Sequence, residues 1–155
     1  MRHRREFLQD AGKGGLLAAL FSAGFLTIPT AWAEERNQAA SDAKTIDEAY
    51  RALGAGAPAV SDAITFTAPE IAENGAVVPV SVTSAIPGTD AIAILVEKNP
   101  FPLAAMTRIS EGTEPYVASR VKMQQTSRVV ALVRAKGTFY IASKDVKVTL
   151  GGCGG

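Results

Sequence analysis

The sequence predicts a mainly β protein: an immunoglobulin-like antiparallel β-sandwich with a short N-terminal helix and a flexible C-terminal arm. Three observations favour this class. Short runs of alternating apolar and polar residues recur between residues 57 and 150, and such runs are typical of half-buried strands. Turn-forming residues separate about seven of these runs in roughly 100 residues, which is the spacing of a sandwich. The last five residues read Gly-Gly-Cys-Gly-Gly and offer nothing to a core.

The first 33 residues have the features of an export signal. Arg4 and Arg5 precede Glu6-Phe7-Leu8, an apolar stretch follows, and Ala31-Trp32-Ala33 provides a cleavage site. This pattern predicts a twin-arginine (Tat) signal, in which Arg4 and Arg5 are the recognition residues. The alternative is a membrane anchor, but the apolar run is short and rich in glycine. We therefore expect a mature periplasmic chain that begins near Glu34 and has no membrane segment.

Residues 34–56 are predicted to form a loose lead-in, up to about residue 43, and one helix. Thr45 and Glu48 have the spacing of a capping box, in which each residue satisfies a backbone N–H of the other. The helix is expected from Ile46 to Leu53 and should end at Gly54. Its apolar residues lie on one stripe, so the helix is expected to dock on the body of the domain.

Residues 57–150 are predicted to form the strands of the sandwich. The run Val129–Val133 is continuously apolar, as expected for a central strand that is covered on both faces. Glu73–Gly75, Lys136-Gly137 and Ser143–Asp145 are interpreted as turns, the last of them solvated. The predicted strands centre on residues 64–66, 78–82, 92–96, 103–109, 117–123, 129–133, 139–141 and 146–150. The last of these leads directly into the glycine-rich segment, so that segment should have a rigid root.

The composition excludes several classes of function. Cleavage after residue 33 would leave 12 basic and 13 acidic residues, and a net charge of −1 does not suit a nucleic-acid partner. The only histidine, His3, would leave with the signal. A chain with one cysteine and no histidine cannot build a Ser-His-Asp, Cys-His or Cys/His zinc site. We therefore expect no enzyme activity, cofactor or metal, and we assign Met106 and Met123 to packing.

Cys153 is the only cysteine and lies between Gly151-Gly152 and Gly154-Gly155. Glycine leaves the backbone free and keeps bulk away from the sulfur. Three residues after Leu150 span about 10 Å when extended, so the thiol could enter another protein's active site. Lys147 is the nearest cation in sequence, and we expect no strong activation of the thiol. The pattern indicates a covalent substrate carrier, with Cys153 as the attachment point and the four glycines as its arm.

Three alternatives to the carrier hypothesis remain open. Cys153 could form an intermolecular disulfide that only joins subunits, for example in a homodimer. The terminal Gly154-Gly155 could bear a thiocarboxylate, although that chemistry is cytoplasmic and the export signal argues against it. A plain sandwich binding module would leave the terminal motif without a role.

Four segments of the chain form a recognisable set: Val146–Gly155, Pro69–Val80, Lys98–Ala104 and Arg120–Ser127. The terminal motif is the most specific of them. Together these segments resemble the SoxY family, the sulfur-carrier subunit of the SoxYZ complex of bacterial thiosulfate oxidation.

The resemblance implies a mechanism and partners. The haem enzyme SoxAX would couple the Cys153 thiol oxidatively to thiosulfate, and SoxB would hydrolyse sulfate from the product to leave a persulfide. In some organisms SoxCD would then oxidise the remaining sulfur. A SoxZ-like subunit would form a heterodimer with this chain and leave the cell on the same signal.

Overall fold

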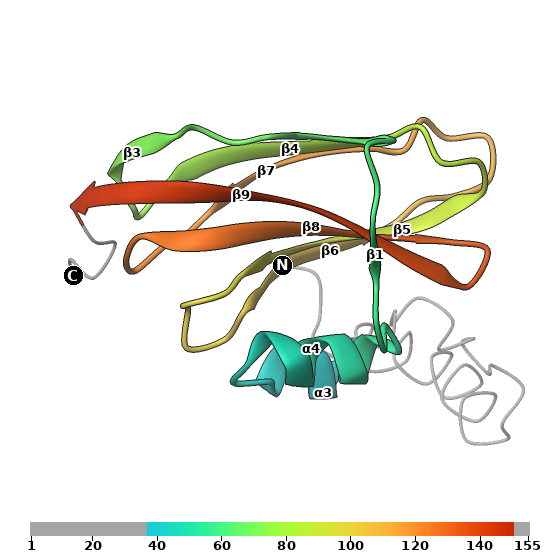
Figure 1. The fold of residues 1–155 in the computed structure, drawn as a ribbon, viewed down its shortest axis with the longest axis horizontal. Coiled ribbons are helices and arrows are strands. Elements are labelled where there is room, and N and C mark those ends of the chain that lie inside the picture. Colours follow the sequence, from blue (N-terminus) through green and yellow to red (C-terminus); the bar gives the residue numbers. More distant parts are fainter. Residues whose placement is uncertain (1–36, 151–155) are drawn as a thin grey trace, which may run out of the picture. The chain divides into compact units, whose positions relative to one another are not determined.

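The computed structural model describes residues 37–150, which form a mainly β structure (Figure 1). Two short helices come first, α3 (Gln38–Asp42) and α4 (Ile46–Leu53). Nine strands follow: β1 (Ala59–Val60), β2 (Ile64–Thr67), β3 (Ile71–Asn74), β4 (Val78–Ser84), β5 (Thr89–Val96), β6 (Leu103–Arg108), β7 (Tyr116–Val121), β8 (Ser127–Ala135) and β9 (Thr138–Leu150).

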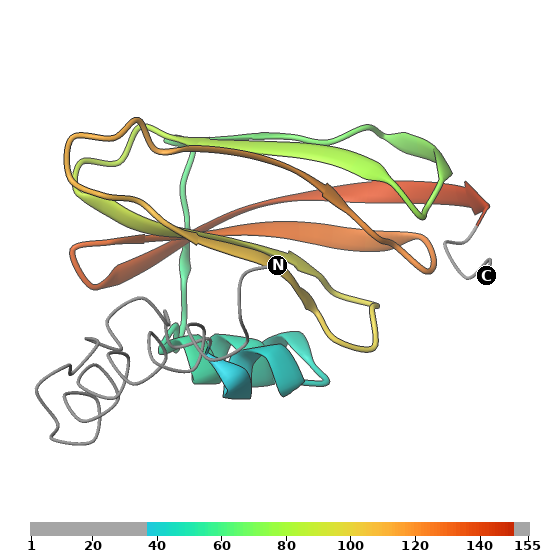
Figure 2. The same ribbon diagram turned by 180° about the vertical axis from the view of Figure 1, so that it is seen from behind.

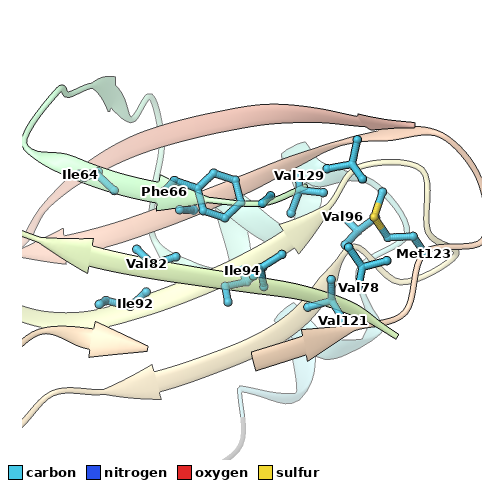
Figure 3. Packing of buried hydrophobic residues seen from close by; sticks show 14 of the residues in the cluster. Ile64, Phe66, Val78, Val82, Ile92, Ile94, Val96, Val121, Met123 and Val129 are labelled. Carbon is cyan, nitrogen blue, oxygen red and sulfur yellow. The ribbon is translucent and has the colours of Figure 1, made fainter. Parts of the chain in front are cut away.

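The strands form two sheets that face each other across a hydrophobic core. The larger sheet has the order β1-β9-β8-β5-β6, with β3 also paired to β9, and the smaller sheet has the order β2-β4-β7. Figure 2 shows the two layers from behind, with the helices on the far side of the larger sheet. Apolar side chains from both sheets meet between the layers in Figure 3, including Phe66 and Val82 of the smaller sheet and Ile94 of the larger one.

The central strands of the larger sheet are covered on both faces. Val129–Val133 of β8 are all buried, as the continuous apolar run predicts. Val129, Ala131 and Val133 face the smaller sheet, whereas Val130 and Leu132 belong to a second apolar cluster beneath the helices. The two clusters explain why β8 lacks the alternation of the outer strands.

Helix α4 has the predicted bounds and caps. The Thr45 hydroxyl accepts a hydrogen bond from the Glu48 N–H at 3.2 Å, and the Glu48 carboxylate accepts from the Thr45 N–H at 3.3 Å. Gly54 follows the helix with a left-handed backbone (φ 77°), a conformation that glycine adopts without steric cost. The buried Ala49 docks the helix on the larger sheet, as predicted.

The expectation of a loose lead-in is wrong within the described residues. Asn37 caps α3 by accepting a hydrogen bond from the Ala40 N–H at 3.0 Å, and its side-chain amide donates to the Ala52 carbonyl of α4 at 2.8 Å. Ala40 is fully buried. The helix is only five residues long and therefore depends on these contacts rather than on its own propensity.

The expectation of a purely antiparallel arrangement is also wrong. Strands β1 and β3 both pair with β9 in the parallel sense. Strand β9 is continuous over 13 residues, so the predicted break into two strands at Ser143–Asp145 does not exist. These three residues are solvent-exposed, as expected, but they lie in the ladder opposite Arg128–Val130. Their polar side chains belong to the outer part of a strand rather than to a turn.

The hairpin between β8 and β9 turns at the predicted residues. Lys136 and Gly137 both have positive φ angles, 50° and 79°. Two consecutive positive φ values are characteristic of the tight hairpin turn that matches the twist of its strands. This turn fixes the register of the full β8–β9 ladder, which pairs Ala135 with Thr138 and ends at the pair Ser127–Val146.

Candidate functional site

The site residues predicted from the sequence lie outside the described residues. They are Arg4 and Arg5, the glycines Gly151, Gly152, Gly154 and Gly155, and Cys153. The structure does describe the strand that leads to the cysteine. We call residues 147–150 of β9 the arm root.

The arm root is the part of β9 that continues past β8. The ladder with β8 ends at Val146, and β3 then runs beside the last residues of β9 (Figure 1). The parallel register places Ile71 opposite Lys147 and Asn74 opposite Leu150. The last described residue before the glycine-rich segment is therefore part of a sheet.

Three hydrogen bonds hold the arm root in addition to the pairing of β3. The Lys147 N–H donates to the Glu70 carbonyl at 2.9 Å. The Val148 N–H donates to the Thr126 hydroxyl at 3.0 Å, and the Thr149 hydroxyl donates to the Glu73 carbonyl at 3.0 Å. This role of Glu70, Glu73, Thr126 and Thr149 is not among the predictions made from the sequence. Their non-local contacts leave no signal in a single sequence.

The connections around the arm root are tied to one another. The Met123 N–H donates to the Gly75 carbonyl at 2.6 Å, which joins the turn before β4 to the segment after β7. The Asn99 side chain donates to the Lys122 carbonyl at 2.7 Å and accepts from the Gln124 N–H at 3.3 Å. The end of the domain beside the arm root is therefore cross-linked by hydrogen bonds between three connections.

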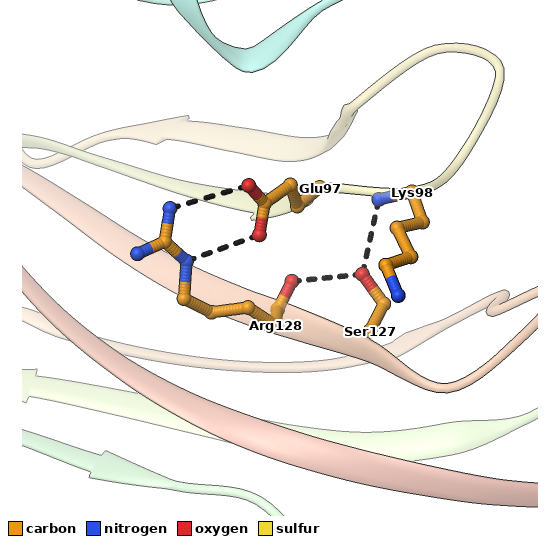
Figure 4. A network of polar contacts seen from close by, with 4 residues as sticks. All are labelled: Glu97, Lys98, Ser127 and Arg128. Carbon is orange, nitrogen blue, oxygen red and sulfur yellow. Dashed lines mark hydrogen bonds and ion pairs between the residues drawn. The ribbon is translucent and has the colours of Figure 1, made fainter.

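A further polar network fixes the start of β8 (Figure 4). The buried Ser127 hydroxyl accepts from the Lys98 N–H at 3.0 Å and donates to the Arg128 carbonyl at 3.1 Å. The Arg128 guanidinium pairs with the Glu97 carboxylate, with 3.1 Å between Nε and Oε2. Because Ser127 directly follows Thr126, this network also holds the hydroxyl that accepts from Val148.

The phenol of Tyr50, in α4, has a perturbed pKa and lies away from the arm root. Burial beneath α4 raises the pKa of Tyr50, and the nearby Arg128 partly opposes this shift. Tyr50 packs against the apolar cluster under the helices. Its shift therefore has a structural cause and does not mark a reactive centre.

The described residues contain few other features of a ligand site. An open hollow of about 570 Å³ lies on the outer face of the smaller sheet, where Arg120 is the one charged residue in its lining. Within residues 37–150, no group of three or more His, Cys, Asp or Glu residues is placed so that it could hold a metal ion. In the same range, no helix is long and apolar enough to cross a bilayer.

The architecture and the terminal motif define a class of protein: a small two-sheet domain whose last strand runs directly into a cysteine flanked by glycines. Residues 49–153 match the family described as "Sulfur oxidation protein SoxY". The chain belongs to the SoxY family. The match ends at Cys153 and includes the whole arm root.

A solved structure supports this assignment. The sulfur carrier protein SoxY from Chlorobium limicola f thiosulfatophilum is similar with 40% identity and a TM-score of 0.62, over 72% of this chain and 97% of that chain. Two weaker likenesses each have 12% identity. They are to the superantigen toxic shock syndrome toxin-1 (TM-score 0.38; 55% and 98% covered) and the human F-spondin reeler domain (TM-score 0.37; 60% and 93% covered). A comparison with curated proteins gave no match.

Proposed function

We propose that this chain is a periplasmic sulfur carrier that holds thiosulfate-derived intermediates covalently on Cys153. The observation that carries the proposal is its membership of the SoxY family, with a match that includes Cys153. The similar protein from Chlorobium limicola is itself a sulfur carrier. The sheet-held root and the four flanking glycines support the same role, because they combine a fixed base with unhindered access to the sulfur.

The chemistry on Cys153 begins with an oxidation. The thiolate and thiosulfate join through a new S–S bond and release two electrons to the haem enzyme SoxAX. SoxB then adds one water, which leaves a persulfide on Cys153 and releases hydrogen sulfate. The carrier itself supplies the nucleophilic thiolate and the geometry of presentation. Where SoxCD is present, it oxidises the persulfide sulfur further.

The proposed partners follow from this reaction sequence. A SoxZ-like subunit forms a heterodimer with this chain, while SoxAX, SoxB and SoxCD dock transiently. Ordering glycines in a partner's active site costs about 1–2 kcal/mol for each residue fixed. Docking is therefore weak and reversible, which suits a carrier that visits several enzymes. We also propose that the two sheets form an immunoglobulin-like β-sandwich and that the Tat signal at Arg4-Arg5 exports the chain.

Mass spectrometry of the protein purified from the periplasm of thiosulfate-grown cells tests the proposal. We expect sulfur-containing adducts that are labile to reductant and map to Cys153. A Cys153→Ser variant should lose the adducts and thiosulfate oxidation together. If the purified protein contained only free thiol or a Cys153–Cys153 disulfide, the carrier role would be wrong and a subunit-linking role would replace it. A sulfur atom on the Gly155 carboxylate would indicate thiocarboxylate chemistry instead.

A further inference from the structure

We propose that β3 is a clasp for the arm root: β9 residues 147–150 detach from β3 in the folded protein, and this opening lengthens the arm that carries Cys153. The use that we assign to this opening, a longer reach for Cys153, rests on the proposed carrier function. Its structural basis is independent of sulfur chemistry, since it depends on how the end of β9 is held.

The first observation is that the arm root has a strand on one side only. Val146 is the last residue of β9 opposite β8, where it pairs with Ser127. Beyond it, on the β8 side, the Thr126 hydroxyl accepts a hydrogen bond from the Val148 N–H. Most of the support comes from β3 on the other side, through a four-residue parallel strand. A short pairing of this kind contributes few hydrogen bonds.

The second observation is the step in burial at Val146. This side chain is fully buried in the core. After it, Lys147 and Thr149 are exposed and Val148 is only partly buried. Segments with few buried apolar contacts and solvent-exposed hydrogen bonds open at lower free energy than the core. Val146 is therefore the natural hinge of β9.

The third observation identifies which strand moves. Strand β3 also has contacts other than those with the arm root on both sides of it. Ala68, before it, is buried in the core, and Gly75, after it, accepts the hydrogen bond from the Met123 N–H. Ala72, in the middle of β3, is buried in the same core. When the pairing breaks, β3 stays with the domain and the end of β9 leaves.

Detachment changes the reach of the thiol. From Leu150 to Cys153 the chain has three residues and spans about 10 Å at most. From Val146 it has seven, which span about 23–25 Å when extended. With β9 paired to β3, the Cys153 thiol can therefore reach an active site near the surface of a partner. With the end of β9 detached, the thiol can reach an active site that lies deeper.

Hydrogen exchange on the mature chain, followed residue by residue by NMR, tests the clasp. We expect the Lys147 and Val148 amides to exchange at least tenfold faster than those of Ala142 and Lys144, which lie opposite β8. Removing the Thr149 hydroxyl by Thr149→Val should raise exchange at Lys147 and Val148 several-fold and leave Ala142 and Lys144 unchanged. Thr65→Val, at an exposed position of β2, is the matched control and should change none of the four.

A nitroxide on Cys153, the only cysteine, gives a second measurement. Its broadening of amide signals in the turn at Gly75 should weaken in Thr149→Val as the label samples a larger volume. The proposal is overturned if the Lys147 and Val148 amides are as protected as Ala142 and Lys144 in both proteins. That result would leave the carrier function untouched, because sulfur adducts on Cys153 are measured separately.

Discussion

The Thr149 hydroxyl donates a hydrogen bond to the Glu73 carbonyl at 3.0 Å and thereby joins residues that are 76 positions apart in the chain. Both side chains are exposed, so the bond adds little to the core. The bond matters for the site because Thr149 lies only four residues before Cys153. Within the described residues, the last contacts before the cysteine are made by β3 and its neighbouring residues, which precede most of the sheet strands in sequence.

Bulk in the arm should interfere with loading and leave folding intact. We expect Gly152→Val to slow the loading of Cys153 in a reconstituted assay by at least about tenfold, the effect of roughly 1.4 kcal/mol of lost transition-state stabilisation. The reason is steric, since the valine Cβ branch would crowd the approach to the neighbouring sulfur. Loading is followed by the mass of the adduct with time.

The matched control for this variant is Gly56→Val, because a Cβ at Gly56 meets no atom within 4 Å. It should load at the wild-type rate, and both variants should unfold at the wild-type urea midpoint. Equal loading of Gly152→Val and wild type would show that the glycines do not provide access.

Met123 supports the domain beneath the arm root. Its side chain is fully buried, in contact with the main core. We expect Met123→Ala to lower the free energy of unfolding by about 2–5 kcal/mol, because it removes buried contacts and leaves a cavity. Urea unfolding followed by circular dichroism measures the loss. Met106→Ala is the control, since Met106 is 41% exposed. It should change the free energy of unfolding by no more than about 0.5 kcal/mol. Similar losses in the two variants would contradict the assignment of Met123 to the core.

Local signals in the sequence predicted much of the fold. The capping box, the apolar stripe and Gly54 defined α4 to the residue, because all of them act within a few positions of one another. The continuous apolar run of Val129–Val133 correctly indicated a strand covered on both faces. These predictions succeeded because the contacts that decide them are short-range or follow from burial alone.

The errors have a common physical cause. Strands β1 and β3 are short and pair in parallel with the distant β9, and no local pattern specifies such a partner. Ser143–Asp145 are polar on both faces because they lie on an exposed part of β9, and polar runs of this kind resemble turns. The same limitation applies to the site: the cysteine and its glycines stand out in the sequence, whereas Thr126, Glu73 and Thr149 become visible only when the strands are assembled.

Removal of the N-cap should destabilise α4 and the face that it covers. We expect Thr45→Ala to lower the free energy of unfolding by about 1 kcal/mol, because the Glu48 N–H loses its acceptor. Thr45→Ser keeps the hydroxyl and should cost much less. Thermal unfolding of both variants checks this, with the expectation that the alanine variant melts several degrees lower. If the serine variant lost as much stability as the alanine variant, packing of the threonine methyl would matter more than the cap.

Burial of Tyr50 should make the domain sensitive to alkaline pH. Its pKa is raised above the ordinary tyrosine value of 10.0, mainly because burial removes water from around the phenol. The folded state therefore holds the phenol proton more tightly than the unfolded state does. The resulting contribution to stability is complete below pH 10 and is lost as the pH rises through the folded-state pKa. Tyr50→Phe removes the titrating group and should reduce the loss of stability above pH 10.

Urea midpoints of wild type and Tyr50→Phe, measured from pH 8 to 11, give the difference directly, because the two proteins differ only in the Tyr50 hydroxyl. We expect parallel curves up to about pH 9.5 and a steeper fall for wild type beyond it. Curves that stay parallel to pH 11 would mean that the Tyr50 phenol ionises as readily in the folded domain as in the unfolded chain. In that case α4 would be packed less tightly against the larger sheet at Tyr50 than at Ala49, which is buried in the same cluster.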